Sequence, residues 1–251
     1  MIDKMELSIK ASQIRKKLGE DESSSIDIFA LSQTIDSLTL IFYPLGKNIS
    51  GACFKNSNSS IIAINSDMSL GRQRFSLAHE LYHLFFDKDQ SSTICSSKIA
   101  GENENEKKAD KFASYFLAPP AALYGAIQKR KSLTGKPLSL GDIIRLEQHF
   151  GISHQAMLVR LSEEKEISAE DIDSMQSGII SAAARLGFDV SLYKPSPEDK
   201  KVQVLGHYIY QADALLQADV ISMGKYEELL LDAFRDDIVF GGEEEGGDVI
   251  D

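Results

Sequence analysis

The sequence predicts an α+β protein in which a mostly helical domain contains a small antiparallel three-stranded sheet and is followed by a C-terminal helical extension. Two observations point to this class: apolar residues recur at helical spacing along most of the chain, whereas β-rich runs are confined to residues 38–65. Hydrophobic residues make up 43% of the 251 residues, which is enough for a buried core. We expect the main domain over residues 1–165, the helical extension over 166–240 and a disordered acidic tail over 241–251.

The N-terminal quarter contains two predicted helices and the predicted sheet. Residues 3–18 carry apolar side chains at roughly helical spacing before Gly19, and Asp27 can cap a second helix that runs to about residue 37. The run LTLIFYPL then predicts a strand. The run GACFKNSNSSIIAIN predicts a hairpin, because two β-rich segments flank the turn residues NSNS. These three strands form the predicted sheet.

Helices are predicted for most of the remaining chain. The segment SLGRQRFSLAHELYHLFF predicts a helix that starts after a cap at Ser69 and ends before Asp87. We expect a polar loop over 88–101, and then a helix within ENENEKKADKFASYFLAPP that stops at the two prolines. A shorter helix follows at about 121–130. The run LEQHFGISHQAMLVRL predicts two helices joined by a tight turn at Gly151.

The C-terminal third has the pattern of further helices. Residues 168–187 predict one helix, and DVSLYKPSPEDKK, residues 189–201, is the best candidate for a linker. The last two predicted helices cover about 197–218 and 222–236.

The composition argues against several classes of protein. A formal net charge of −11 disfavours nucleic-acid binding, which needs a surface rich in lysine and arginine. The N-terminus lacks the apolar segment of a signal peptide, and no run approaches the about 18 apolar residues of a membrane span. We therefore expect a cytoplasmic protein. Cys53 and Cys95 are too few for a disulfide scaffold, so we interpret both as reduced packing residues.

The segment FSLAHELYHLFFDKD holds two histidines four residues apart within a predicted helix. This spacing puts His79 and His83 on one face, one turn apart, so both imidazoles can bind one cation. Glu80 is rotated by about 100° from His79 and can reach a water molecule beside the metal. The pattern is typical of a zinc hydrolase, in which the two histidines bind Zn²⁺ and the glutamate is the general base.

The surroundings of the two histidines strengthen this interpretation. Their helix is apolar on most faces, and burying two imidazoles and a carboxylate without a use would be costly. A catalytic zinc normally has a third protein ligand, and ENEKKADKFA on the next long helix offers one. Glu106 can complete the zinc site, and Asp110, one turn on, can accept the Nδ1 proton of a ligating histidine. Glu102 and Glu104, nearer the start of that helix, are weaker candidates.

The runs RQRFSLAHELYHLFF and EKKADKFASYFLAP together resemble the ImmA/IrrE family of zinc metallopeptidases, and the resemblance covers about residues 8–165. It implies a compact zincin-like peptidase fold, with His79, His83 and Glu106 as zinc ligands and Glu80 as the catalytic base. Members are known for cutting helix-turn-helix transcriptional repressors, often encoded nearby, which switches on mobile-element or stress genes. The resemblance therefore implies such a repressor as the protein substrate.

One residue departs from the family pattern. The family usually has HELGH, whereas Tyr82 here replaces the glycine. The tyrosine can pack in the core, or it can narrow the cleft or offer its phenol to the substrate as an oxyanion donor. Other candidate oxyanion donors remain open, and the sequence does not choose among them: Tyr115, Tyr124, His149 and His154.

Two other functions are compatible with parts of the sequence. Residues 138–163 have the shape of a DNA-binding helix-turn-helix, but neighbouring acidic residues outweigh Arg145 and Arg160. Alternatively, the protein is a non-catalytic regulator whose C-terminal helices bind a partner. An intact Glu80 argues against this, since a structural metal site needs no base. We therefore prefer a metalloendopeptidase, whose acidic surface suits a basic DNA-binding substrate.

Overall fold

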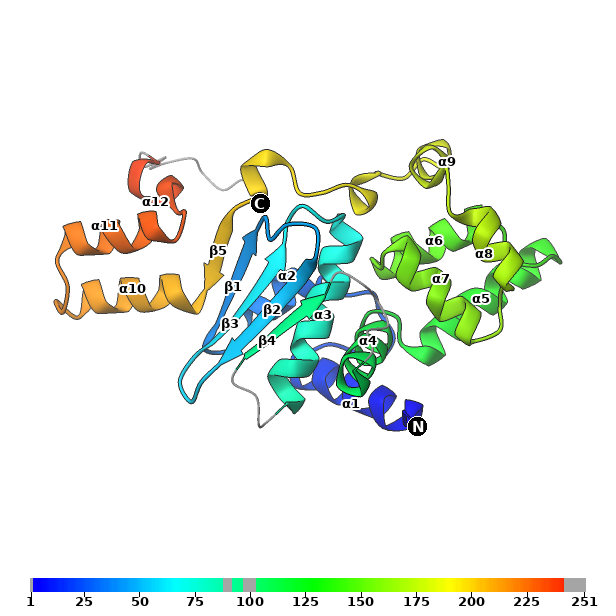
Figure 1. The fold of residues 1–251 in the computed structure, drawn as a ribbon, viewed down its shortest axis with the longest axis horizontal. Coiled ribbons are helices and arrows are strands. Elements are labelled where there is room, and N and C mark those ends of the chain that lie inside the picture. Colours follow the sequence, from blue (N-terminus) through cyan, green and yellow to red (C-terminus); the bar gives the residue numbers. More distant parts are fainter. Residues whose placement is uncertain (1, 88–91, 97–102, 242–251) are drawn as a thin grey trace.

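The computed structural model describes residues 2–87, 92–96 and 103–241. Helices pack on a mixed five-stranded sheet, a group of helices lies to one side of it, and the paired helices α10 (His207–Gln217) and α11 (Met223–Asp232) extend from the opposite edge (Figure 1). Glu102 and residues 242–251 of the predicted acidic tail lie outside the described residues.

The sheet corrects the prediction of three antiparallel strands. Its order is β4-β2-β3-β1-β5, and β1 runs parallel to β3 while the other neighbours are antiparallel. The predicted hairpin is present as β2 and β3. β1 pairs with β3 on the side away from β2, and it runs parallel to β3. The strands are β1 Leu38–Tyr43, β2 Ile49–Lys55, β3 Ser60–Asn65, β4 Ser92–Ser96 and β5 Gln203–Gly206.

The two edge strands were not predicted. β4 lies inside the segment expected to be a polar loop, and it pairs with β2. β5 lies inside the segment expected to begin the helix 197–218, and it pairs with the free edge of β1. Both strands are short and weak in β-forming residues, so their conformation depends on hydrogen bonds offered by a strand distant in sequence.

The helices confirm most of the predicted helical segments. The segment 168–187 is an exception, because Gly178 with φ +75° divides it into two helices. Among the described residues, no helix is both long and apolar enough to cross a membrane. The helices are α1 Lys4–Lys17, α2 Ile28–Gln33, α3 Leu70–Phe86, α4 Glu104–Leu117, α5 Pro120–Thr134, α6 Leu140–Phe150, α7 His154–Glu163, α8 Ala169–Met175, α9 Ile179–Arg185, α10 His207–Gln217, α11 Met223–Asp232 and α12 Asp236–Phe240, with short 3-10 turns η1 Ser191–Tyr193 and η2 Glu198–Lys200.

The core places α3 and α4 in fixed positions relative to the sheet. α3 packs on β2 and β3, α4 packs on α3, and α1 covers α4. The apolar stripe of α4 includes Phe112 and Phe116, both fully buried, and burying one such side chain contributes about 1.5–3 kcal/mol. Arg15 of α1 is also buried and donates a hydrogen bond of 2.6 Å from Nη1 to the backbone oxygen of Phe116. α4 is therefore held between α3 and α1, with one side packed on α3.

The predicted linker, residues 189–201, is in contact with the rest of the chain. The backbone N–H of Leu70 donates to the Lys194 oxygen over 2.8 Å, and the Tyr193 hydroxyl donates to Glu147 Oε2 over 2.9 Å. This segment thus connects α3 and α6 before the chain enters β5.

Candidate metal centre

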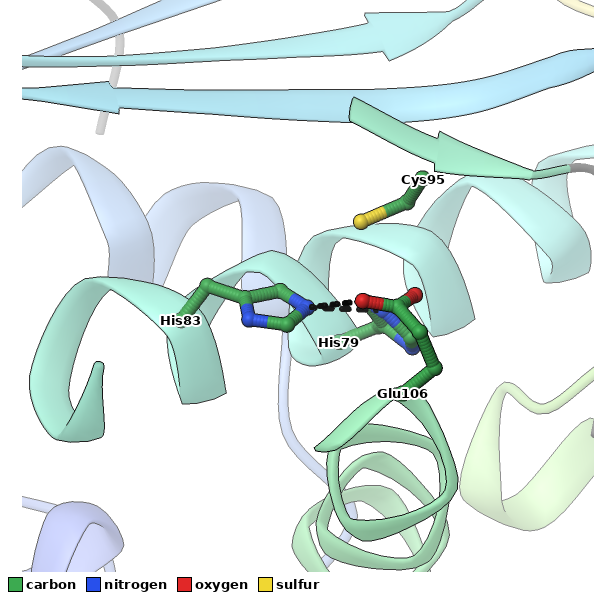
Figure 2. Close-up of side chains that lie close together, drawn as sticks. All are labelled: His79, His83, Cys95 and Glu106. Atoms are coloured by element: carbon green, nitrogen blue, oxygen red, sulfur yellow. Dashed lines mark hydrogen bonds and ion pairs between the residues drawn. The ribbon is translucent and has the colours of Figure 1, made fainter. Parts of the chain in front are cut away.

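The two histidines of α3 lie side by side and are buried. His79 is 6% exposed and His83 is 1% exposed. Their separation of four residues brings the two Nε2 atoms to 3.1 Å from each other, as the helical spacing predicts. Both rings lie on the face of α3 that is turned toward α4 (Figure 2).

Glu106 reaches both rings from the first turn of α4. Its Oε2 lies 3.2 Å from His79 Nε2, and its Oε1 lies 3.4 Å from His83 Nε2 (Figure 2). Asn103 caps α4 by accepting a hydrogen bond from the backbone of Asn105, so the start of this helix is well defined. Packing of α3 against α4 thus brings together the three side chains that the sequence singled out.

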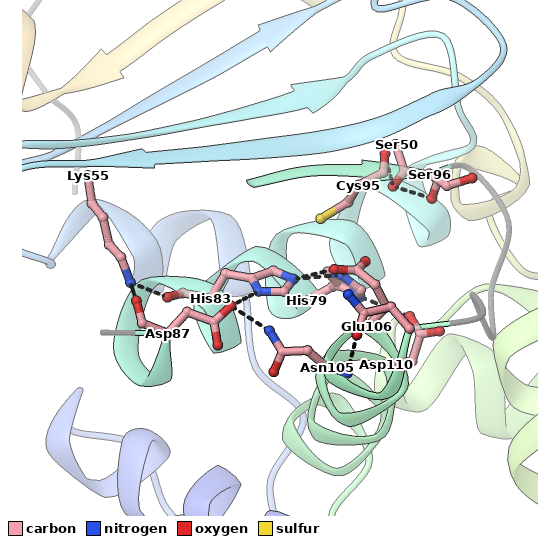
Figure 3. Close-up of polar contacts among 11 residues, drawn as sticks. Ser50, Lys55, His79, His83, Asp87, Cys95, Ser96, Asn105, Glu106 and Asp110 are labelled. Carbon is pink, nitrogen blue, oxygen red and sulfur yellow. Dashed lines mark hydrogen bonds and ion pairs between the residues drawn. The ribbon is translucent and has the colours of Figure 1, made fainter. Parts of the chain in front are cut away.

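A carboxylate contacts the Nδ1 atom of each histidine, on the side of the ring away from Nε2. His79 Nδ1 lies 2.9 Å from Asp110 Oδ1. The sequence predicted a contact between Asp110 and the Nδ1 of a ligating histidine, without choosing which histidine. His83 Nδ1 lies 2.5 Å from Asp87 Oδ2, a partner that sequence reasoning missed although it follows His83 by four residues. Asn105 Nδ2 donates to the same Asp87 oxygen over 2.7 Å (Figure 3).

Lys55 adds support from the sheet. Its Nζ donates to the backbone oxygen of His83 over 2.7 Å and also to the backbone oxygen of Asp87 (Figure 3). An ammonium at the carboxyl end of α3 also interacts favourably with the helix dipole. The end of the histidine-bearing helix is therefore fixed by β2.

The three converging donors fit a metal ion. When both Nδ1 atoms donate their protons to carboxylates, both Nε2 atoms present lone pairs, and these face each other and the Glu106 carboxylate. Two lone pairs and a carboxylate repel one another at these distances, so a positive charge is needed between them. Tetrahedral coordination with bonds of about 2.0 Å places donors about 3.3 Å apart. The separations of 3.1, 3.2 and 3.4 Å lie close to that value.

The electrostatics of His79 agree with this reading. Burial lowers the pKa of His79, but its hydrogen bonds to Asp110 and Glu106 outweigh burial and raise the pKa to about 9. The carboxylates around the ring therefore favour a positive charge at this point.

Glu80 is a buried carboxylate beside these donors. It is fully buried, and among the described residues neither of its oxygens has a nitrogen or oxygen hydrogen-bond partner. Burial raises its pKa to about 7, although His79 lowers it. Gly51 of β2 makes room for it, because a Cβ there would lie 2.7 Å from Glu80 Oε1. A carboxyl group with a pKa near neutrality can both accept and return a proton.

A comparison with protein families decides the classification. The Peptidase_M78 model, which describes the IrrE N-terminal-like domain, matches residues 37–162. This range is half of the chain, runs from β1 to α7 and includes all the side chains of the metal centre described above. The chain belongs to the ImmA/IrrE family of metallopeptidases. A search of curated proteins found no match.

Family membership confirms the predicted metallopeptidase class, and the buried group of His79, His83 and Glu106 is able to hold a metal ion. The roles of the individual residues, and zinc as the metal, remain predictions.

Cys95 is the member of this group that sequence reasoning missed. Its Sγ belongs with the histidine nitrogens and a Glu106 oxygen to a set of atoms that lie within 4.8 Å of one another. Cys95 and Cys53 are both free and buried, as expected for reduced thiols. The sequence had no sign of a ligand here, because Cys95 comes from a strand that was expected to be a loop and has no metal-binding spacing to the histidines.

Tyr82, the departure from the family pattern, lies in an aromatic group between α3 and α4. It is 4% exposed, and its ring packs 5.4 Å from that of Phe86 and 5.7 Å from that of Phe112. Burial raises the pKa of the Tyr82 phenol to about 12, so the hydroxyl stays protonated near neutral pH. A role toward the substrate remains a prediction.

The other candidate oxyanion donors have varied surroundings. Tyr124 on α5 is 63% exposed, whereas Tyr115 on α4 is 5% exposed. His154 forms a hydrogen bond of 2.6 Å between its Nδ1 and Glu147 Oε1, and its Nε2 lies 2.9 Å from the Met175 oxygen. The ring of His149 packs against Phe150. These contacts do not select one of the four as the donor.

Proposed function

We propose that this chain is a zinc-dependent endopeptidase that hydrolyses a peptide bond in a helix-turn-helix transcriptional repressor and thereby derepresses mobile-element or stress-response genes. One observation carries the catalytic part: three metal-binding donors converge beside a buried carboxylate whose oxygens have no nitrogen or oxygen partner among the described residues. Family membership supports a protein substrate.

The donor set supports zinc as the metal. Two imidazoles and one carboxylate are a ligand set of catalytic zinc sites. His79, His83 and Glu106 would hold the ion through Nε2, Nε2 and a carboxylate oxygen. When bound, zinc supplies a Lewis acid that polarises a carbonyl group and increases the acidity of water. Asp110 and Asp87 keep the Nδ1 protons in place, so that the Nε2 lone pairs of both histidines face the ion.

Glu80 moves the proton in this proposal. Its carboxylate accepts a proton from the attacking water, and the resulting carboxylic acid passes it to the leaving amine nitrogen when the C–N bond breaks. Its pKa of about 7 suits both steps near neutral pH. Because Glu80 is fully buried, bulk water is excluded and does not compete for the proton that Glu80 carries.

Charge supports the proposed substrate class. The chain has a net charge of −11, and a DNA-binding repressor carries a basic surface, so the two attract each other over long distances. This part predicts that association with the repressor weakens as the salt concentration rises. Binding that does not depend on salt would count against it.

The alternative is a non-catalytic or DNA-associated regulator. The α6–α7 pair has the order of a helix-turn-helix, but Arg160 is 1% exposed and donates to Ser114 Oγ over 3.0 Å. An arginine engaged in this way is not available for DNA phosphates. We therefore expect no direct nucleic-acid contact through this pair.

The test combines metal content with cleavage of the repressor encoded nearby. Wild-type protein should contain about one zinc per chain and cut the repressor. Glu80→Gln should keep the metal and lose at least about 10²-fold in cleavage, because only the base is removed. His79→Ala should lose the metal and the activity. Glu170→Gln on the exposed side of α8 is the matched control and should behave as wild type.

Two results would overturn the proposal. One is cleavage by Glu80→Gln at the wild-type rate. The other is wild-type protein that binds no divalent metal under conditions in which it is folded.

A further inference from the structure

Cys95 stands beside the proposed zinc ligands without a role in the proposed reaction. It is 1% exposed, and Figure 2 shows its side chain directed from β4 toward the histidines and Glu106. Its Sγ lies in the same 4.8 Å set as the three donors of that site. Thiolate sulfur is among the strongest protein ligands for zinc.

The strand holds this cysteine in place. Cys95 pairs with Gly51 of β2, and Ser50 Oγ donates to the Ser96 backbone oxygen over 3.0 Å (Figure 3). Side chains alternate along a strand, so Cys95 faces α3 while its neighbours Ile94 and Ser96 face solvent. The exposed Ile94, at 65%, indicates that the direction of Cys95 follows from the pairing and not from a general preference for burial.

We propose that Cys95 Sγ is a fourth protein ligand to the metal in the resting enzyme, and that the resting site is therefore latent. A site with four protein ligands is closed, whereas catalysis needs one open position for water or substrate. As the sulfur–metal bond would form, the thiol proton would pass to solvent water and the sulfur would bind as a thiolate. This inference rests on the proposed zinc site.

The geometry requires only a small movement. With zinc–sulfur and zinc–nitrogen bonds of about 2.3 and 2.0 Å, tetrahedral geometry places Sγ about 3.5 Å from the other donors. The atoms of the set lie within 4.8 Å of one another, so Sγ must approach each of the other donors by at most about 1.3 Å.

Cys95 is also the donor best placed to leave. Both histidines are held by carboxylates, at 2.9 Å for His79 and 2.5 Å for His83. β4, in contrast, lies at the edge of the described sheet and pairs only with β2. Displacing an edge strand breaks fewer hydrogen bonds than moving a central helix, so release of Sγ opens the site without loss of the metal.

The test is X-ray absorption at the zinc edge on wild-type protein, Cys95→Ser and Cys53→Ser, with zinc content measured on each sample. Cys53→Ser is the matched control, because Cys53 is a buried free thiol on the neighbouring strand β2. We expect one sulfur at about 2.3 Å in wild type and in Cys53→Ser, and none in Cys95→Ser. Cleavage of the repressor should be faster with Cys95→Ser than with wild type.

The outcomes are distinct. Zinc bound by nitrogen and oxygen alone in wild type would overturn the ligand assignment, and this measurement needs no variant. A sulfur ligand together with no faster cleavage by Cys95→Ser would overturn the latency. Cys95→Ala is the second variant if the serine protein does not fold. Wild-type protein without bound zinc would instead overturn the proposed function on which this inference rests.

Discussion

The substitution Gly51→Ala tests the position of Glu80 without touching a proposed ligand. The new Cβ would lie 2.7 Å from Glu80 Oε1, 3.2 Å from Glu80 Cγ and 3.1 Å from the backbone oxygen of Ala63. Ordinary contacts begin at 3.4 Å, so Oε1 must move by about 0.7 Å. The backbone oxygen of Ala63 belongs to the central strand β3 and cannot give way easily. The carboxylate of Glu80 therefore moves.

A shift of this size should cost activity more than stability. Misplacement of a catalytic group by about 1 Å can cost about 10²-fold in rate, so we expect kcat/KM to fall about 10–10²-fold. Overpacking of this kind costs about 1–3 kcal/mol of unfolding free energy, or about 2–4 °C in Tm for each kcal/mol in a chain of this size. Metal content should be unchanged, since none of the three proposed ligands is displaced.

The assay is kcat/KM for cleavage of the repressor, with zinc content and thermal unfolding measured on the same samples. Gly125→Ala is the control, because a Cβ on this residue of α5 meets nothing within 4 Å. The reasoning would be refuted by a Gly51→Ala protein that is fully loaded with metal and cleaves as fast as the control.

Three further predictions concern the ligands and the pH dependence of stability. Glu106→Gln should lose the metal on dialysis while Glu104→Gln, an exposed neighbour on α4, keeps it; equal metal contents in the two would contradict the ligand assignment. Asp110→Asn should weaken metal binding by about 10–100-fold in competition with a chelator, because the tautomer of His79 is then no longer fixed. An unchanged metal affinity would contradict this. Burial lowers the pKa of His154, but its hydrogen bond to Glu147 outweighs burial and raises the pKa above 6.5. The contribution of this pair to the free energy of unfolding is therefore fully present below pH 6.5, and it is lost as the pH rises through the raised pKa of His154. Thermal unfolding at several pH values should show a smaller loss of Tm above pH 6.5 for His154→Gln than for wild type, and equal slopes would contradict the linkage.

The proposed metal site was largely predictable because its geometry is local. Two histidines four residues apart share a helix face whatever the rest of the chain does. The same holds for Glu106 and Asp110, whose spacing puts both on one side of α4. Sequence reasoning needed only the assumption that α3 and α4 pack together, and the mostly apolar surface of α3 and the apolar stripe of α4 supported it.

The sheet was predicted less well, because strand pairing is not local. The β2–β3 hairpin was found from its turn residues, but the partner of β1 depends on which edge is available after the chain has folded. β4 and β5 are short segments that become strands on contact with β2 and β1. No pattern within four or five residues determines such a pairing.

The sequence by itself determined the helices of the site, the paired histidines, the adjacent Glu80 and the carboxylates of α4, since helical spacing fixes which side chains share a face. Only the tertiary structure decided what surrounds them. β2 brings Gly51 against Glu80, and β4 brings Cys95 to the histidines. These contacts join segments that follow different periodicities and lie far apart in the chain. They exist only after the sheet has packed on α3.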